Sequence, residues 1–249
     1  GRPVGVVGVL RDISLKKELE RQRADFLAML THDIKNPMHA ILGYAELLLD
    51  DAVDDEQQKL LQRLRENALT VHSLVTNYLD FSKVESGHLA LVRQPVGINL
   101  LLQRIEQLYA GEAFRREITL RMSLQEGLPL IDGDLLALER VFANLLHNAL
   151  KFTPRLGVVV IRSAVQTDAV AVTFTDSGPG IAQEELASLF EKYRRAKQAR
   201  ASDGAGLGLF IVKALVEEHG GQVQVESAPG QGACFSVLLP IASPIVHAT

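Results

Sequence analysis

The most restrictive feature of this sequence is the spacing of apolar residues in the helical stretch between Asp54 and Ser86. Its apolar positions alternate steps of four and three residues, which is the spacing of a coiled-coil or bundle seam. The seam consists of Leu60, Leu64, Val71, Leu74, Tyr78 and Phe81, with Asn67 in the remaining position. A second stripe, Leu61, Ala68 and Val75, gives this helix more apolar surface than one partner helix can cover. We therefore expect an α-helical hairpin, with its first helix in residues 15–50, that forms a four-helix bundle from two chains.

A proline interrupts the first of these helices, in the sequence THDIKNPMHAI of residues 31–41. Pro37 removes a backbone hydrogen bond and costs a helix interior about 3 kcal/mol. At about 100° per residue, His32 projects away from the apolar stripe that includes Leu30 and Ile34, so it faces solvent. The histidine is either an ordinary solvated residue or a reactive group, and the proline is either a plain kink or a hinge beside that group.

After Gly87 the pattern changes to alternating strands and helices. Alternation of apolar and polar residues predicts strands at 117–124, 157–165, 169–175, 221–227 and 233–239. Helical periodicity predicts helices at 98–110, 134–152, 183–193 and 207–219. We therefore expect an α/β layer domain in residues 88–241 after a helical domain in residues 15–87, whereas the tail of residues 242–249 carries no readable pattern.

The composition of the 249-residue chain excludes several classes of function. An apolar content of 47% is that of a globular protein, and a net charge of -4 argues against general nucleic-acid binding. No apolar run reaches the length of about 18 residues that a membrane span needs. The single cysteine, Cys234, excludes an internal disulfide and a cysteine-based zinc site, and it fits a cytoplasmic protein.

Polar side chains gather on the predicted helix 134–152, in the sequence NLLHNALKF. Asparagine is a poor choice for a helix interior, yet Asn144 and Asn148 stand one turn apart, with Lys151 close by. Two carboxamides side by side can hold Mg²⁺, which takes oxygen ligands and is often shared with substrate phosphates. We expect a magnesium and phosphate site here, and ordinary polar surface residues are the alternative.

Asp176 follows a predicted strand in the sequence TDSGPGI. A buried carboxylate beside Gly178 and Gly180 can accept a hydrogen bond from an exocyclic amine such as that of adenine, because the glycines allow a close backbone approach. A plain turn is the alternative reading of the same residues.

A second glycine-rich segment, GAGLGLFIV, opens the predicted helix 207–219. Gly204, Gly206, Leu207 and Gly208 would present backbone N–H groups and the positive end of the helix dipole to phosphate. The spacing matches neither the P-loop nor the Rossmann pattern. The polar and basic residues 191–204 before it form either a mobile lid or a solvated loop.

Taken in order, these segments resemble the transmitter region of two-component sensor histidine kinases. The similar motifs are HDIKNP (H box), NLLHNALKFTP (N box), DSGPGI (first glycine box), LFEKYRRA (F box), GAGLGLFIV (second glycine box) and APGQGACFSVLLP (last glycine box). The resemblance implies an ATP-binding α/β sandwich of the GHKL ATPase (Bergerat) type, with ATP and Mg²⁺ as cofactors and Asn148 as the metal ligand. It also adds Tyr193, in the F box, to the ATP-binding residues.

The resemblance further implies a homodimeric, ATP-dependent protein-histidine kinase that autophosphorylates His32 and transfers the phosphoryl group to an aspartate of a response regulator receiver domain. Asp33 would orient the His32 ring and act as acid or base, and Asn36 would assist dephosphorylation of the regulator. In the related hydrolases a glutamate stands where this chain has Asn144, so no base for water is evident. A GHKL-type ATPase clamp and a nucleotide-binding scaffold without histidine phosphorylation are the alternatives.

The first residues carry a weaker resemblance. The segment VGVVGVLRDIS, within residues 1–14, resembles the last strand of a PAS sensor domain and its exit into a linker. One strand cannot fold alone. This resemblance implies that the rest of a sensor precedes the helical hairpin.

Overall fold

A computed structural model describes residues 34, 38, 41–45, 48, 54–85, 90–191 and 207–241 of the chain. The chain divides into two compact units, Gly1–His88 and Leu89–Thr249. The remnant of a PAS domain predicted at 1–14 and the proline predicted to bend the first helix lie outside the described residues.

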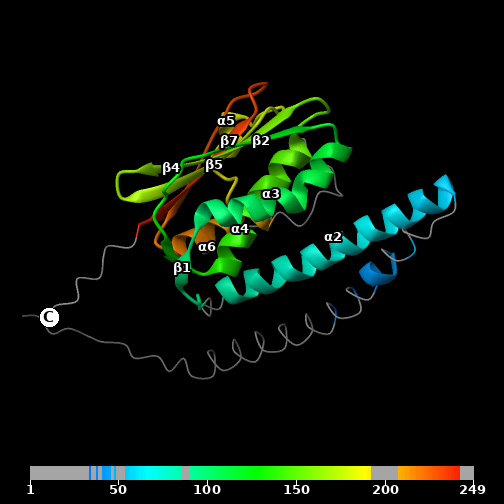
Figure 1. Cartoon of the computed structure of the whole chain (residues 1–249), viewed down its shortest axis with the longest axis horizontal. Helices are drawn as coiled ribbons and strands as arrows, with labels where there is room; N and C mark the ends of the chain where they lie inside the picture. Colours follow the sequence, from blue (N-terminus) through cyan, green and yellow to red (C-terminus); the bar gives the residue numbers. More distant parts are fainter. Residues whose placement is uncertain are drawn as a thin grey trace, which may run out of the picture. The chain divides into compact units, whose positions relative to one another are not determined.

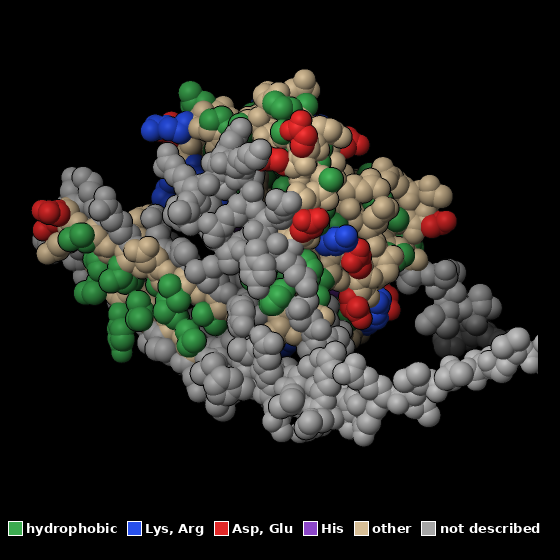
Figure 2. Space-filling view, turned by 180° about the vertical axis from the view of Figure 1, so that it is seen from behind, with side chains coloured by type: hydrophobic (Ala, Val, Ile, Leu, Met, Phe, Trp, Pro, Cys, Tyr) green, Lys and Arg blue, Asp and Glu red, His purple; other side chains and the backbone are tan. Residues whose placement is uncertain are grey.

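The helical unit contains one long helix, α2 (Asp55–Glu85). Asp54 caps its N-terminus, because its Oδ1 atom accepts hydrogen bonds from the backbone N–H groups of Glu56 and Gln57 at 3.0 and 2.7 Å. Seam residues of α2 lie exposed, with Leu60 at 60% and Leu64 at 45% relative exposure. Figure 2 shows hydrophobic side chains gathered along this unit. Exposed apolar patches on a protein surface commonly mark an interaction site.

A five-stranded sheet forms one layer of the second unit. Its strand order is β2 (Thr119–Leu124), β4 (Val158–Gln166), β5 (Ala169–Asp176), β7 (Ala233–Pro240) and β6 (Gln222–Ser227). Strands β2 and β4 are parallel, and the other neighbours are antiparallel. Two short strands, β1 (Gln94–Val96) and β3 (Ile131–Gly133), pair with each other in a separate antiparallel ladder.

Three helices, α3 (Ile98–Arg115), α4 (Leu135–Phe152) and α6 (Gly208–Glu218), cover one face of the sheet (Figure 1). On β5, Val170, Val172 and Phe174 point to this face and are fully buried, and the Phe174 ring lies 6.0 Å from the ring of Phe142 on α4. Period-two alternation on β5 also places Asp176 on the helix-covered face. Asp176 is therefore the last residue of the β5 row that packs between the sheet and the helices.

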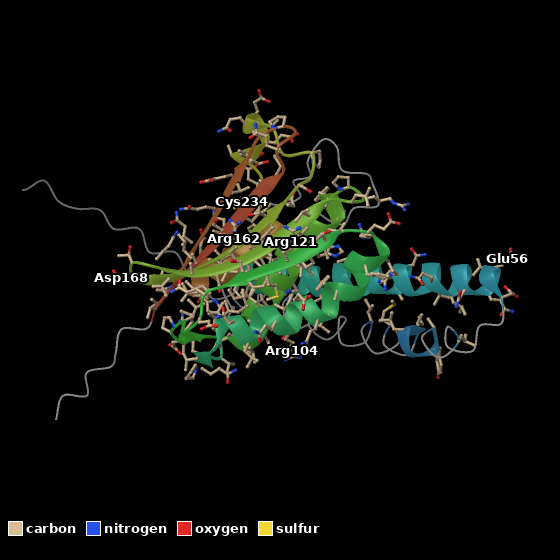
Figure 3. The ribbon with its side chains drawn as sticks, turned by 45° about the horizontal axis from the view of Figure 1, so that its top comes forward. Glu56, Arg104, Arg121, Arg162, Asp168 and Cys234 are labelled. Atoms are coloured by element: carbon tan, nitrogen blue, oxygen red, sulfur yellow. The ribbon has the colours of Figure 1, made fainter. Side chains whose placement is uncertain are left out.

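Among the described residues, none of the helices α3, α4 and α6 covers the opposite face of the sheet. One cross-strand row on it runs through Arg121, Val160, Thr175 and Cys234, and Figure 3 shows Arg121, Arg162 and Cys234 on the sheet strands. Alternation of an apolar inner face with a more polar outer face is the pattern of a sheet covered on one side. The predicted α/β sandwich is therefore confirmed.

The predicted elements differ from the observed ones in three places. The three-residue strands β1 and β3 were not predicted, because a segment this short shows no periodicity. Helix α3 continues through Gly111 to Arg115, beyond its predicted end at 110. The helix predicted over 183–193 is wrong as far as the described residues extend, since α5 is a single turn, Gln183–Leu186, followed by turns up to Glu191.

Candidate nucleotide-binding site

Asp176 ends strand β5 and is 8% exposed. Its Oδ1 atom accepts hydrogen bonds from the backbone N–H groups of Gly178, at 2.8 Å, and Ala233, at 3.3 Å. Within the described part of the chain, no hydrogen bond reaches the Oδ2 atom. One oxygen is therefore fixed by the fold, and the other remains available to accept a hydrogen bond from a ligand.

Burial raises the pKa of Asp176 above its ordinary value, although the N–H groups of Gly178 and Ala233 act in the opposite direction. The carboxylate is thus held in an environment that disfavours its charge. A buried group with such a shifted pKa at the edge of a domain is characteristic of a functional site.

Gly178 brings the end of helix α4 to this carboxylate. A Cβ atom at position 178 would lie 2.7 Å from Asp176 Oδ1 and 2.9 Å from the carbonyl oxygen of Phe152, the last residue of α4. No side chain fits in that space. The sequence reading of Gly178 as a point of close backbone approach is consistent with this packing, and the approach joins Asp176 to α4.

Helix α4 presents its polar side next to the same loop. Asp134 caps the helix, and apolar residues that recur on its inner side, among them Leu138, Leu145 and Leu146, are fully buried. At about 100° per residue, Asn144, Asn148 and Lys151 lie within one sector of the helix surface. Both asparagines are half-buried. Their carboxamide oxygens can serve as ligands for a hard cation.

The start of helix α6 faces Asn144. A Cβ atom on Gly208 would lie 3.8 Å from Asn144 Oδ1. Leu207, the N-cap residue, is 2% exposed and makes no side-chain cap, so the first backbone N–H groups of α6 are not capped by it. Leu207 therefore anchors the helix, and its N-terminus can bind an anion beside Asn144.

Gly180 allows two loops of the fold to pack closely against each other. It has a φ of +71°, and a Cβ atom there would lie 1.9 Å from the carbonyl oxygen of Ala228. The same two loops are joined by a 2.7 Å hydrogen bond from Gly230 N–H to the Pro179 carbonyl. The first glycine box is thus interlocked with the last one, which holds the Asp176 loop in place.

Three residues near the site were not predicted from the sequence. Ala233 acts through its backbone N–H, for which a sequence holds no signal. Phe152 follows Lys151 directly, and the Lys151 ammonium lies 5.2 Å from its ring centroid. An aromatic residue at the end of α4, next to Lys151, could have been recognised in the sequence as part of the site. Arg140 lies one turn before Asn144, and burial lowers its pKa to about 10, so it still carries its positive charge at neutral pH.

The structure therefore brings Asp176, Gly178, Asn144 and Gly208 into one region, between the end of β5, the polar side of α4 and the start of α6. Outside the described residues lie six predicted site residues: His32, Asp33, Asn36, Tyr193, Gly204 and Gly206. In the part of the chain that the structure describes, no three His, Cys, Asp or Glu side chains form a metal site, and no helix is long and apolar enough to cross a membrane.

Two family models match the chain. The model described as "His Kinase A (phospho-acceptor) domain" matches residues 22–87, and the one described as "Histidine kinase-, DNA gyrase B-, and HSP90-like ATPase" matches residues 133–243. The chain is 32% identical to the alginate biosynthesis sensor protein KinB of Pseudomonas aeruginosa over 244 residues, which are 97% of this chain and 41% of KinB.

Two solved structures are similar. Full-length ShkA in complex with AMPPNP has 33% identity and a TM-score of 0.69 over 88% of this chain and 46% of ShkA. The mycobacterial sensor histidine kinase MprB has 31% identity and a TM-score of 0.53 over 59% of this chain and 97% of the MprB chain.

The fold, the site and these matches define the class of protein: the chain belongs to the two-component sensor histidine kinases and comprises their transmitter region. MprB, of which this chain covers 97%, is described as a sensor histidine kinase. An ATPase without histidine phosphorylation is not favoured, because a phospho-acceptor domain precedes the ATP-binding domain. The chain spans less than half the length of KinB.

Proposed function

We propose that this chain is the catalytic core of a homodimeric sensor kinase that autophosphorylates His32 with ATP and then phosphorylates an aspartate on a receiver domain. The observation that carries the proposal is the asymmetry of Asp176, whose Oδ1 is fixed by two backbone N–H groups while Oδ2 accepts nothing from the described residues. Such a carboxylate can recognise the exocyclic amine of adenine.

The donor set on α4 fits a magnesium ion that is shared with the ATP phosphates. Asn148, with Asn144 one turn earlier, offers neutral oxygen ligands, and Mg²⁺ prefers a few protein oxygens plus water and phosphate. When bound, the ion neutralises charge that develops on the phosphates. Lys151 and the N-terminus of α6 at Gly208 would hold the phosphate oxygens.

Asn144 directs the chemistry toward transfer instead of hydrolysis. A carboxamide cannot accept the proton of an attacking water, whereas a glutamate at this position could. ATP would therefore persist in the site until another nucleophile arrives. Phosphoryl transfer then depends on positioning and electrostatics more than on covalent help from the protein.

His32 would supply that nucleophile from the helical unit. Asp33 would hold one ring nitrogen by a hydrogen bond and leave the other free to attack the γ-phosphate. Asn36 would orient a water during dephosphorylation of the regulator, and Pro37 would give the phosphorylated segment local mobility.

The helical unit supports assembly into a dimer. Leu60, Leu64 and Val71 lie on one side of α2 and are 40–60% exposed within a single chain. A soluble protein does not leave such a stripe uncovered. A second copy of the hairpin would complete the four-helix bundle, and a PAS domain before residue 15 would carry the input signal.

Incubation with γ-labelled ATP and magnesium tests the proposal. We expect acid-labile, alkali-stable label on the chain, and we expect His32→Gln to eliminate it without changing ATP affinity, because ATP binds to the other unit. Persistent label on His32→Gln would move the phosphoacceptor elsewhere. Release of ADP without any labelling would support an ATPase instead.

A further inference from the structure

The segment that enters the ATP-binding unit is bound to it by one backbone hydrogen bond and by an arginine side chain. We call residues 90–93, which precede β1, the linker. The Val92 N–H donates to Asp134 Oδ2 at 2.9 Å, while the Val92 side chain is 76% exposed. The Arg93 guanidinium donates to the carbonyl oxygens of Asp132, at 3.1 Å, and Glu218, at 2.8 Å. Polar contacts therefore hold the linker, and apolar burial contributes little.

Asp134 connects the linker to two other elements. Its Oδ1 atom caps α4 by accepting from the N–H groups of Leu136 and Ala137, both at 3.0 Å. Its own backbone N–H donates to Nε2 of His219 at 3.0 Å. Burial acts to raise the pKa of Asp134, but the backbone N–H groups of Ala137, Val92 and Leu136 lower it, in keeping with a carboxylate that is bonded in its charged form.

His219 is buried to 2% exposure at the C-terminus of α6. Because Nε2 accepts from Asp134, the ring proton must lie on Nδ1, which donates to the Leu215 carbonyl at 2.7 Å. Gly133 leaves room for the ring, since a Cβ atom there would lie 3.0 Å from His219 Cδ2. Both ring nitrogens are thus used to join α6 to the cap of α4.

These contacts lie at the far ends of the two helices that border the nucleotide site. Helix α6 has 11 residues, or about 16 Å at the usual rise, from Gly208 beside Asn144 to the His219 cap. Helix α4 runs from the Asp134 cap to the asparagines. The linker contacts are thus separate from Asn144 and Gly208, and their loss removes no described contact of the nucleotide site.

We propose that Asp134 and His219 are positioning residues for phosphotransfer, which together fix the direction of the linker relative to α4 and α6. This role rests on the proposed function, in which ATP in one unit must meet His32 in the other. Release of the linker leaves the ATP site intact. It lets the ATP-binding unit adopt many orientations that do not bring ATP to His32, so phosphotransfer becomes slower.

Asp134→Asn tests the linker bond alone. The carboxamide oxygen still caps α4, because asparagine is as good an N-cap as aspartate, but an NH₂ group replaces the oxygen that accepts from Val92. We expect the Val92 amide to exchange its hydrogen at least about tenfold faster. Autophosphorylation at saturating ATP should slow about tenfold, while the ATP affinity and the melting temperature stay as in the wild type.

Asp54→Asn is the matched control. Asp54 caps α2 through the same pair of N–H contacts, to Glu56 and Gln57, and the described residues give it no contact with the linker. The Asp54→Asn variant should autophosphorylate at the wild-type rate. His219→Gln keeps an acceptor for the Asp134 N–H and should also label near that rate, whereas His219→Leu removes it and should label as slowly as Asp134→Asn.

Unchanged exchange at Val92, or an unchanged labelling rate in Asp134→Asn, overturns the positioning role. A loss of melting temperature and ATP affinity in parallel with labelling also overturns it, because this would show a purely structural role. A wild-type chain that binds ATP and never labels refutes the proposed function instead. If His219→Leu does not fold, Asp134→Asn decides the question.

Discussion

At the scale of single residues, Asp176 separates the demands of folding from those of binding. Its Oδ1 accepts two backbone N–H groups, which an amide oxygen can also accept, and only Oδ2 is left for the ligand. The residue therefore does not need its charge to fold, and burial makes that charge unfavourable. Substitution should distinguish the two roles.

Asp176→Asn is expected to weaken ATP binding by about 5- to 150-fold, because a mispaired buried group costs about 1–3 kcal/mol. The nucleotide-free protein should be no less stable than the wild type at pH 7, since the variant removes a disfavoured charge. Calorimetry and thermal unfolding measure these two effects. Unaltered ATP affinity would place the adenine site elsewhere.

The raised pKa of Asp176 also predicts opposite effects of acid on binding and on stability. Protonation places the hydrogen on Oδ2, so adenosine affinity should fall as the pH drops, beginning above the ordinary range of an aspartate. The folded state binds this proton more readily than the unfolded state, so the contribution of Asp176 to stability rises as the pH falls through the folded pKa.

Adenosine is the better probe for that measurement, because ATP titrates through its own phosphates. Affinity should be measured from neutral pH downward in the wild type and in Asp176→Asn. The variant should lose the pH dependence that the wild type shows. A wild-type affinity that stays constant down to the ordinary aspartate pKa would contradict the prediction.

A sequence reveals functional residues best where a side chain is of a type that the local helix or strand does not favour. Asn144 and Asn148 stand out in an apolar helix, and Asp176 stands out at the end of a strand. By contrast, Ala233 contributes a backbone N–H, and His219 acquires its role from Asp134, which lies 85 residues earlier in the chain. No local pattern marks such contacts.

At the scale of elements, the interlocked glycine loops determine how firmly Asp176 is held. Gly180→Ala should lower the unfolding free energy by about 2 kcal/mol or more, because its Cβ atom would meet the Ala228 carbonyl and its φ is positive. Gly230 has a similar φ of +79° with open space around it. Gly230→Ala should therefore cost only about 1 kcal/mol.

Denaturant unfolding measures the unfolding free energies of both variants. Because both positions have a positive φ, the difference between the two values reports the steric clash at position 180 and not the backbone strain. ATP affinity should fall in Gly180→Ala and remain close to the wild-type value in Gly230→Ala. Equal stability of the two variants would show that the loops do not interlock in solution.

The elements predicted correctly are those with a strong period. Strands β4, β5 and β7 alternate over eight or nine residues, and helix α4 has a clear apolar side. The errors occur where tertiary contacts override local preference. The predicted helix 98–110 stops before Gly111, yet α3 continues to Arg115 because Ala113 is buried against the core.

At the scale of the whole molecule, the order of the six motifs predicted the two-part organisation, whereas the hydrogen bonds that hold the linker followed only from the structure. The seam on α2 carries the remaining prediction, which concerns assembly. A glutamate in the middle of an apolar interface leaves a charge buried without a partner in each of two symmetric copies.

Leu64→Glu should therefore convert the proposed dimer into monomers that sediment at half its mass at micromolar concentration. ATP affinity should stay within about twofold, because every described nucleotide contact lies in the other unit. Gln58→Glu adds the same charge to α2 on a different side of the helix and should leave the dimer intact. If Leu64→Glu sediments like the wild type, the exposed stripe is not the dimer interface. If Gln58→Glu dissociates as well, charge alone explains the effect, and the seam would have no special role in assembly.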